Sequence, residues 1–258
     1  IVDSIEFGLK KDWSDTLRTN ITIFSIDHTD STYDDQQAFP STLYNRPLDQ
    51  RFVIETMAQL NASESGFLKG MVDANKTGVV GYSMGGYGLV NNLGAGYNDT
   101  IAASALASPN ALLSAHASGN PEYRANLDSR IKAGFAIGPW GMGSGFWSKN
   151  DLKGIEVPTF YLAGDADNVS GYANGTRAIF EGAVNSDRYL LTFKNAGHNA
   201  GAPYPLPIEI ANNEDKLGAS HYTDPVWDNV RMNNIMDHFA TVFFDYYLKN
   251  ETARKSYL

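Results

Sequence analysis

Apolar residues gather in five short runs along the chain, and each run leads into a turn rich in Gly, Asp or Ser. The runs are dominated by Val, Ile, Phe and Tyr, which is typical of buried β-strands. The predicted strands are residues 21–26, 78–82, 132–137, 157–162 and 189–193. Segments with helical spacing separate them. This alternation predicts an α/β fold, with a mostly parallel central sheet and helices on both faces.

Two of the predicted helices have an apolar face. One follows Pro47, a residue suited to a first helical turn, and it carries Phe52, Val53, Met57 and Leu60 on one side. The last helix of the chain has a longer stripe with steps of three and four, formed by Met232, Ile235, Phe239, Val242 and Tyr246. A stripe of this kind packs on a sheet, so we interpret it as core.

The composition indicates one globular domain over residues 1–258. Apolar residues make up 43% of the chain and charged residues 19%, and no apolar run approaches the roughly 18 residues that span a bilayer. The net charge of −9 argues against nucleic acid and anionic membranes as partners, because phosphate favours clustered Lys and Arg. The chain has no cysteine, which excludes disulfides and a Cys nucleophile.

Glycosylation sequons are more frequent than chance predicts. Seven occur, at Asn20, Asn61, Asn75, Asn98, Asn168, Asn174 and Asn250, against roughly three expected from composition. They favour an extracellular or periplasmic protein. An Asn-rich bacterial sequence in which sequons carry no meaning is the alternative, and it leaves a cytoplasmic location open.

The pattern G-x-S-x-G at residues 81–85 places Ser83 between a predicted strand and a predicted helix. A serine held on such a sharp turn needs small neighbours two positions away on both sides, and Gly81 and Gly85 supply them. The turn exposes the hydroxyl, and the backbone N–H of Met84 points to where an oxyanion forms. A glycine-rich turn that only packs a helix on a strand is the structural alternative.

A serine nucleophile needs a base, and the base needs an acid that fixes its tautomer. In this architecture the chain order is serine, acid, histidine. The turn after the strand at 157–162 offers Asp165 and Asp167, and His198 follows the last predicted strand. We favour Asp167 as the acid because it lies further into its turn, whereas Asp165 is placed to cap the turn through backbone N–H groups.

Metal ions and cofactors are not expected. The Asp165-x-Asp167 spacing resembles the start of a calcium loop, but Ser170 and Thr176 occupy the positions where that loop requires Gly and Glu. No pair of histidines has the short spacing of a zinc site.

A loop at residues 138–147 follows the third strand of the sheet, beside the predicted nucleophile. It contains Trp140, Met142, Phe146 and Trp147, which form a candidate substrate pocket, and its glycines permit movement. A surface loop whose Trp residues cover the core is the alternative.

Taken together, these motifs resemble the dienelactone-hydrolase-related and platelet-activating-factor-acetylhydrolase-like serine esterases of the α/β-hydrolase superfamily. The resemblance covers nearly the whole chain. The residues that carry it are Ser25-Ile26-Asp27-His28-Thr29, Asn45-Arg46-Pro47-Leu48-Asp49, Gly81-Tyr82-Ser83-Met84-Gly85-Gly86, Gly164-Asp165-Ala166-Asp167 and Ala196-Gly197-His198-Asn199. It implies an α/β-hydrolase fold, in which the five predicted strands correspond to the fourth to eighth strands.

The sequence departs from that family in two ways. Dienelactone hydrolases use a cysteine where Ser83 stands, so ordinary carboxylic esters are favoured over dienelactones. The first three strands and the His-Gly oxyanion loop, with the second oxyanion donor, are missing, and residues 1–20 resemble only the helix that follows them. We therefore expect an incomplete chain or a separate N-terminal segment, and a homo-oligomer is left open.

The predicted function is hydrolysis of small-molecule or polymeric carboxylic esters through Ser83, His198 and Asp167, with an acyl-enzyme intermediate. Other uses of the same residues are a peptidase, a thioesterase or a cofactor-free perhydrolase. A catalytically silent binding protein is an alternative of a different class, which the missing oxyanion segment suggests.

Overall fold

The computed structural model describes residues 5–258, except for 13–17, 26–34, 67, 203–205 and 213–217. The chain divides into two compact units, Ile1–Asn75 and Lys76–Leu258. All of the predicted catalytic and pocket residues belong to the second unit. His28, part of the family resemblance, lies outside the described residues.

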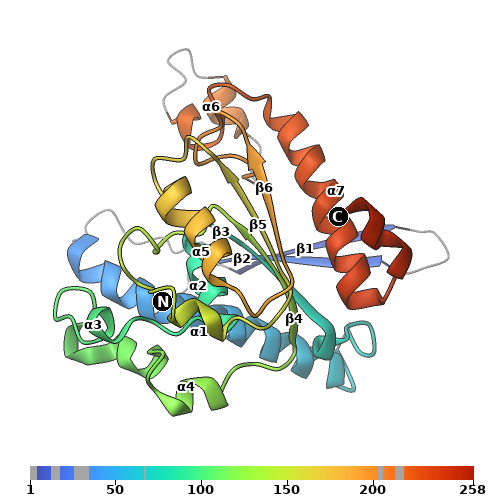
Figure 1. The fold of residues 1–258 in the computed structure, drawn as a ribbon. Helices are drawn as coiled ribbons and strands as arrows, with labels where there is room; N and C mark the ends of the chain where they lie inside the picture. Colours follow the sequence, from blue (N-terminus) through green and yellow to red (C-terminus); the bar gives the residue numbers. More distant parts are fainter. Residues whose placement is uncertain (1–4, 13–17, 26–34, 67, 203–205, 213–217) are drawn as a thin grey trace. The chain divides into compact units, whose positions relative to one another are not determined.

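Two strands of the first unit form a small antiparallel sheet (Figure 1). Strand β1 (Ile5–Asp12) pairs with β2 (Arg18–Ser25), and Ile5 lies opposite Ser25. The helix expected within residues 1–20 is therefore wrong. The reason is visible in the sequence of β1, where apolar Ile5, Phe7 and Leu9 alternate with other residues at the period of a strand. The strand expected at 21–26 is present, but its partner is antiparallel β1.

The long helix of the first unit is α1 (Asp35–Ala62). The helix predicted after Pro47 is confirmed, but it begins earlier, so Pro47 lies inside it. A proline removes one helical hydrogen bond, and here the helix continues across it. Phe52, expected on the apolar face, is exposed, whereas Met57 is buried as predicted.

The second unit is built on a four-stranded sheet with all strands parallel, in the order β3-β4-β5-β6. Its strands are β3 (Thr77–Tyr82), β4 (Ile131–Ile137), β5 (Thr159–Gly164) and β6 (Arg188–Phe193). All four agree with the predicted strands to within two residues at each end. The α/β class with a parallel sheet is therefore confirmed.

Helices cover both faces of this sheet. Successive parallel strands lie side by side, so right-handed crossovers bring the connecting helices to one face. That face receives α2 (Met84–Asn92) and α5 (Arg177–Gly182), and α7 (Asn229–Lys249) covers the other face after the last strand (Figure 1). The remaining α-helices are the short α3 (Asp99–Ala102), α4 (Pro121–Ala125) and α6 (Ile208–Ala211). Among the described residues, no helix is long and apolar enough to cross a membrane.

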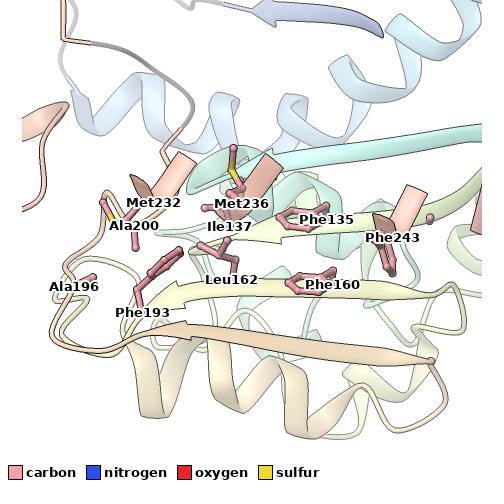
Figure 2. Close-up of a cluster of buried hydrophobic side chains, with 11 residues drawn as sticks. Phe135, Ile137, Phe160, Leu162, Phe193, Ala196, Ala200, Met232, Met236 and Phe243 are labelled. Carbon is pink, nitrogen blue, oxygen red and sulfur yellow. The ribbon is translucent and has the colours of Figure 1, made fainter. Parts of the chain in front are cut away.

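One cluster of buried apolar residues in the second unit lies between the sheet and α7. Phe135, Phe160 and Phe193 point from three adjacent strands towards Met236 and Phe243 of α7 (Figure 2). The rings of Phe135 and Phe160 stack at 4.7 Å between centroids. Every second residue of a strand faces the same side, so Tyr161, between Phe160 and Leu162, points to the opposite face, where its ring meets Phe180 of α5.

The apolar stripe predicted for the last helix is close to the observed one. Met232 and Val242 are buried as expected, and Ile235 and Phe239 are partly buried against the core. Two buried apolar residues of α7 were not in the predicted stripe, namely Met236 and Phe243. They follow Met232 by four and eleven residues, which places them on the same side of the helix.

We predict that Phe243→Ala lowers the free energy of unfolding by about 3–5 kcal/mol, because it leaves a cavity in a closely packed aromatic cluster. Val230→Ala on the same helix is the control. Val230 is 68% exposed, and we expect a change of at most about 0.5 kcal/mol. Urea-induced unfolding measures both, and equal losses would show that α7 does not close the core.

Candidate active site

Ser83 occupies the single position between strand β3 and helix α2. Its backbone has φ 52° and ψ −114°, a conformation that costs about 1–3 kcal/mol for a residue other than glycine. Neighbouring backbone hydrogen bonds hold it there. The Ser83 N–H donates to the carbonyl of Ile137 on β4, and the Ser83 carbonyl accepts from the N–H groups of Tyr87 and Trp140. The strained turn is thus fixed from both sides.

The turn requires glycine at two positions around Ser83. A Cβ added to Gly81 would lie 2.4 Å from the carbonyl oxygen of Gly85, and one added to Gly86 would lie 2.8 Å from Cα of Pro139. A Cβ on Gly85 would meet nothing within 4 Å. The expectation that Gly81 must be small is confirmed, but on the other side the crowded residue is Gly86, because the backbone of residue 85 turns its Cα to open space.

His198 contacts Ser83 and Asp167 through the two nitrogens of its imidazole. Nε2 lies 2.9 Å from Oγ of Ser83, and Nδ1 lies 2.9 Å from Oδ2 of Asp167. The three side chains come from turns that follow β3, β5 and β6, and parallel strands end at the same edge of a sheet. The structure therefore brings together the three residues that the sequence nominated for catalysis.

The two candidate acids make different contacts. Asp167 holds His198, and its Oδ1 accepts hydrogen bonds from the N–H groups of Val169 and Ser170. Asp165 accepts a hydrogen bond from the N–H of Asn195 instead. Asn195 begins the turn that leads to His198, and its φ is positive, at 62°. Asp165 therefore caps the histidine turn, and Asp167 is the carboxylate that reaches the imidazole.

The carboxylate of Asp167 is nearly excluded from water. Its side chain is 1% exposed, and that of His198 is 13% exposed. Burial alone would raise the pKa of Asp167, but hydrogen bonding to His198, the charge of His198 and two backbone N–H groups favour the ionised form and hold the pKa below its usual value. An ionised carboxylate at this position orients the imidazole and stabilises its positive charge.

Met84 is the first residue of α2. The first N–H groups of a helix have no acceptor within the helix, and the helix dipole makes this end attractive to negative charge. The Met84 N–H therefore lies next to Ser83, at the position where the motif predicts an oxyanion donor.

The sequence matches no family model and no curated protein. The fold and the geometry around Ser83 therefore carry the functional argument. No group of three or more His, Asp or Glu side chains in the described part of the chain is arranged to hold a metal ion.

The aromatic residues of the 138–147 loop divide into two groups. Phe146 and Trp147 are each 3% exposed and pack around Tyr87, and the indole N–H of Trp147 donates to the carbonyl of Ala95. Their burial fits the interpretation that they cover the core. Trp140 and Met142 are only partly buried, and Trp140 hydrogen-bonds Ser83 through its backbone. These two are the pocket candidates with surface to offer a substrate.

Sequence reasoning assigned no role to Tyr82, Asn199 and Asp224, although they contact the turns that carry Ser83 and His198. Tyr82 immediately precedes Ser83 and Asn199 immediately follows His198, so their positions in the sequence could have pointed to them. Asp224 lies in an irregular segment before α7, and no pattern in the sequence points to it.

We predict that Gly81→Ala lowers the free energy of unfolding, whereas Gly85→Ala does not lower it. The added methyl group collides with backbone in the first variant and meets open space in the second. Gly85 lies within α2, so alanine there is expected to stabilise the helix by about 0.5–1 kcal/mol. Thermal or urea unfolding separates the two, and equal destabilisation would contradict the geometry of this turn.

We also predict a pH-dependent contribution of Asp167 to stability. Its pKa is lower in the folded than in the unfolded protein, where it is near 3.8, so the carboxylate stabilises the fold above that pH, and this stabilisation is lost as the pH falls through the folded pKa. The difference in unfolding free energy between wild type and Asp167→Asn should shrink below about pH 3.8. A difference that is constant from neutral to acidic pH would contradict this.

Proposed function

We propose that this protein is a serine hydrolase that cleaves carboxylic esters through Ser83, His198 and Asp167. The observation that carries the proposal is the contact of one imidazole with both partners, at 2.9 Å to the hydroxyl and 2.9 Å to the buried carboxylate. The strained backbone of Ser83, which exposes its hydroxyl at a strand-to-helix turn, supports the role of nucleophile.

The first half of the reaction forms an acyl-enzyme. Nε2 of His198 takes the proton of the Ser83 hydroxyl while Oγ attacks the ester carbonyl carbon. The carbonyl oxygen becomes an oxyanion, to which the Met84 N–H donates a hydrogen bond. Collapse of the tetrahedral intermediate breaks the bond to the alcohol oxygen, and His198 gives its proton to the departing alcohol.

The second half releases the acid. His198 takes a proton from water, the hydroxide attacks the acyl carbon, and Ser83 leaves with the proton returned by His198. Asp167 keeps its charge throughout, because its low pKa favours the ionised form, and it stabilises each imidazolium.

The arrangement of the chain supports an α/β-hydrolase fold as part of the proposal. Nucleophile, acid and histidine follow β3, β5 and β6 in the order serine, aspartate, histidine, which is the order of that superfamily. The four parallel strands with helices on both faces fit the second half of such a sheet.

The proposed substrates are uncharged esters with apolar groups, including polymeric esters. A protein with a net charge of −9 does not favour anionic substrates. Trp140, which hydrogen-bonds Ser83 through its backbone, and Met142 are partly buried. Their apolar side chains suit an aromatic or aliphatic acyl or alcohol group.

The proposal is tested with Ser83→Ala and with two matched aspartate variants. We expect Ser83→Ala to abolish both labelling by a fluorophosphonate serine probe and hydrolysis of a short nitrophenyl ester. Asp167→Asn should lower kcat by about 10⁴-fold, because the imidazole loses its orienting charge. Asp165→Asn should keep near wild-type kcat, because an amide oxygen still accepts the hydrogen bond from Asn195.

Two outcomes would overturn the proposal. Hydrolysis that persists in Ser83→Ala would place the chemistry elsewhere. Absence of labelling and of ester turnover in a demonstrably folded wild-type protein would favour a hydrolase-like binding protein instead. A panel of esters varied in acyl and alcohol size, with polymeric esters and aromatic diesters included, then defines the substrate.

A further inference from the structure

The turns that carry Ser83 and His198 are joined by a hydrogen bond between the residues next to them. The hydroxyl of Tyr82 donates to Oδ1 of Asn199 at 2.9 Å, across 117 positions of sequence. Tyr82 immediately precedes Ser83, and Asn199 immediately follows His198. The Tyr82 ring also lies against the imidazole, with 5.2 Å between ring centroids and an angle of 33° between the planes.

Asn199 can make this bond in one orientation only. Its Nδ2 donates to the backbone carbonyls of Ser220 and Thr223, at 2.6 and 3.0 Å. Carbonyl oxygens accept and never donate, so the amide nitrogen must face them, and Oδ1 is left to accept from Tyr82. The Asn199 side chain thus uses both amide hydrogens and one lone pair of Oδ1 to connect the histidine turn to its surroundings.

The other side of the histidine turn is also held. Oδ2 of Asp224 accepts from the N–H of Gly197 at 2.7 Å, and its Oδ1 accepts from the N–H groups of Val226 and Trp227. The residues before and after His198 are therefore both anchored to the segment that leads into α7. The bond from Tyr82 extends this anchoring to the nucleophile.

We propose that Tyr82 and Asn199 are positioning residues that set the separation of Ser83 Oγ and His198 Nε2. The inference rests on the proposed function and deepens it. The Asp167 hydrogen bond fixes how the imidazole is rotated, but the imidazole sits on a turn whose distance from Ser83 must be fixed separately. The Tyr82–Asn199 bond links the two backbones at the points closest to the reacting atoms.

The expected effect is on the chemical step. A displacement of about 1 Å between reacting groups can cost on the order of 10²-fold in rate. We expect Tyr82→Phe, which removes one oxygen and keeps the ring packed, to lower kcat for a nitrophenyl ester about tenfold or more while KM changes by less than about twofold. Asn199→Ala should give a similar or larger loss.

The two residues should act as one unit. If their bond sets the geometry, the double variant Tyr82→Phe/Asn199→Ala has about the same kcat as Asn199→Ala alone, because the hydroxyl has no partner left to lose. If the losses multiply instead, the residues act separately and the positioning role of the bond is refuted.

Tyr189→Phe is the matched control. The Tyr189 hydroxyl is hydrogen-bonded to the hydroxyl of Tyr247 at 3.0 Å, and its ring packs on the same apolar cluster as that of Tyr82. It lies near the amino end of β6, away from the edge that carries the triad. The same atom is removed, so any general loss of stability is matched, and kcat should stay within about twofold of wild type.

Burst kinetics distinguish positioning from misfolding. A variant that only folds poorly has a smaller burst amplitude with the wild-type acylation rate in the remaining active molecules, whereas a misplaced histidine gives full amplitude and slow acylation. Wild-type acylation rates in Tyr82→Phe and Asn199→Ala, with Ser83→Ala inactive, would overturn this inference and leave the proposed function intact. Activity in Ser83→Ala would overturn the proposed function itself.

Discussion

The parallel register of four adjacent strands is the constraint on which the site depends. Because β3, β4, β5 and β6 run in the same direction, their carboxyl ends lie along one edge, and the turns that follow them meet there. Ser83 and His198 are 115 positions apart in sequence, yet each sits within five residues of the end of its strand. Loss of register in β3, β5 or β6 would carry Ser83, Asp167 or His198 out of reach of the other two.

The edge of the sheet combines strain with burial. Ser83 keeps an unfavourable backbone conformation because hydrogen bonds from β4, α2 and the following loop hold it. Asp167 keeps its charge although it is almost fully buried, because two backbone N–H groups and an imidazole face it. In both cases the surrounding structure supplies interactions that offset a local cost. The function that we propose requires such groups to be prepared for reaction before a substrate arrives.

Much of this arrangement follows from local patterns in the sequence. The strands of the second unit are short apolar runs bounded by turn residues, and Ser83, Asp167 and His198 each follow such a run, so both the strands and the convergence of their ends were predictable. Local sequence patterns failed where contacts between distant parts of the chain determine the structure. The burial of Phe146 and Trp147 around Tyr87 depends on contacts that no local periodicity encodes. Strand β1 was missed although its alternation of apolar residues is local.

The residues around the three candidate catalytic side chains were also predictable only in part. Asp165 and Asp167 are two positions apart, but Asp165 is exposed and Asp167 is buried. A turn rule separated them, because Asp165 accepts a hydrogen bond from the N–H of Asn195 whereas Asp167 contacts His198. Gly85 and Gly86 were not separated, because the crowding comes from Pro139, more than 50 positions away. Asp224 had no signal at all, since its partner at Gly197 is a backbone N–H, which every residue except proline possesses.

The backbone hydrogen bond between Trp140 and Ser83 affects which substitutions the site can accept in evolution. The bond uses main-chain atoms, so it survives replacement of the indole by almost any other side chain. Beyond it, Gly143, Ser144 and Gly145 are exposed. Substitutions can therefore accumulate in this exposed part of the loop while the bond to Ser83 stays in place. If Ser83 is the nucleophile that we propose, substrate selectivity can change in evolution without loss of reactivity.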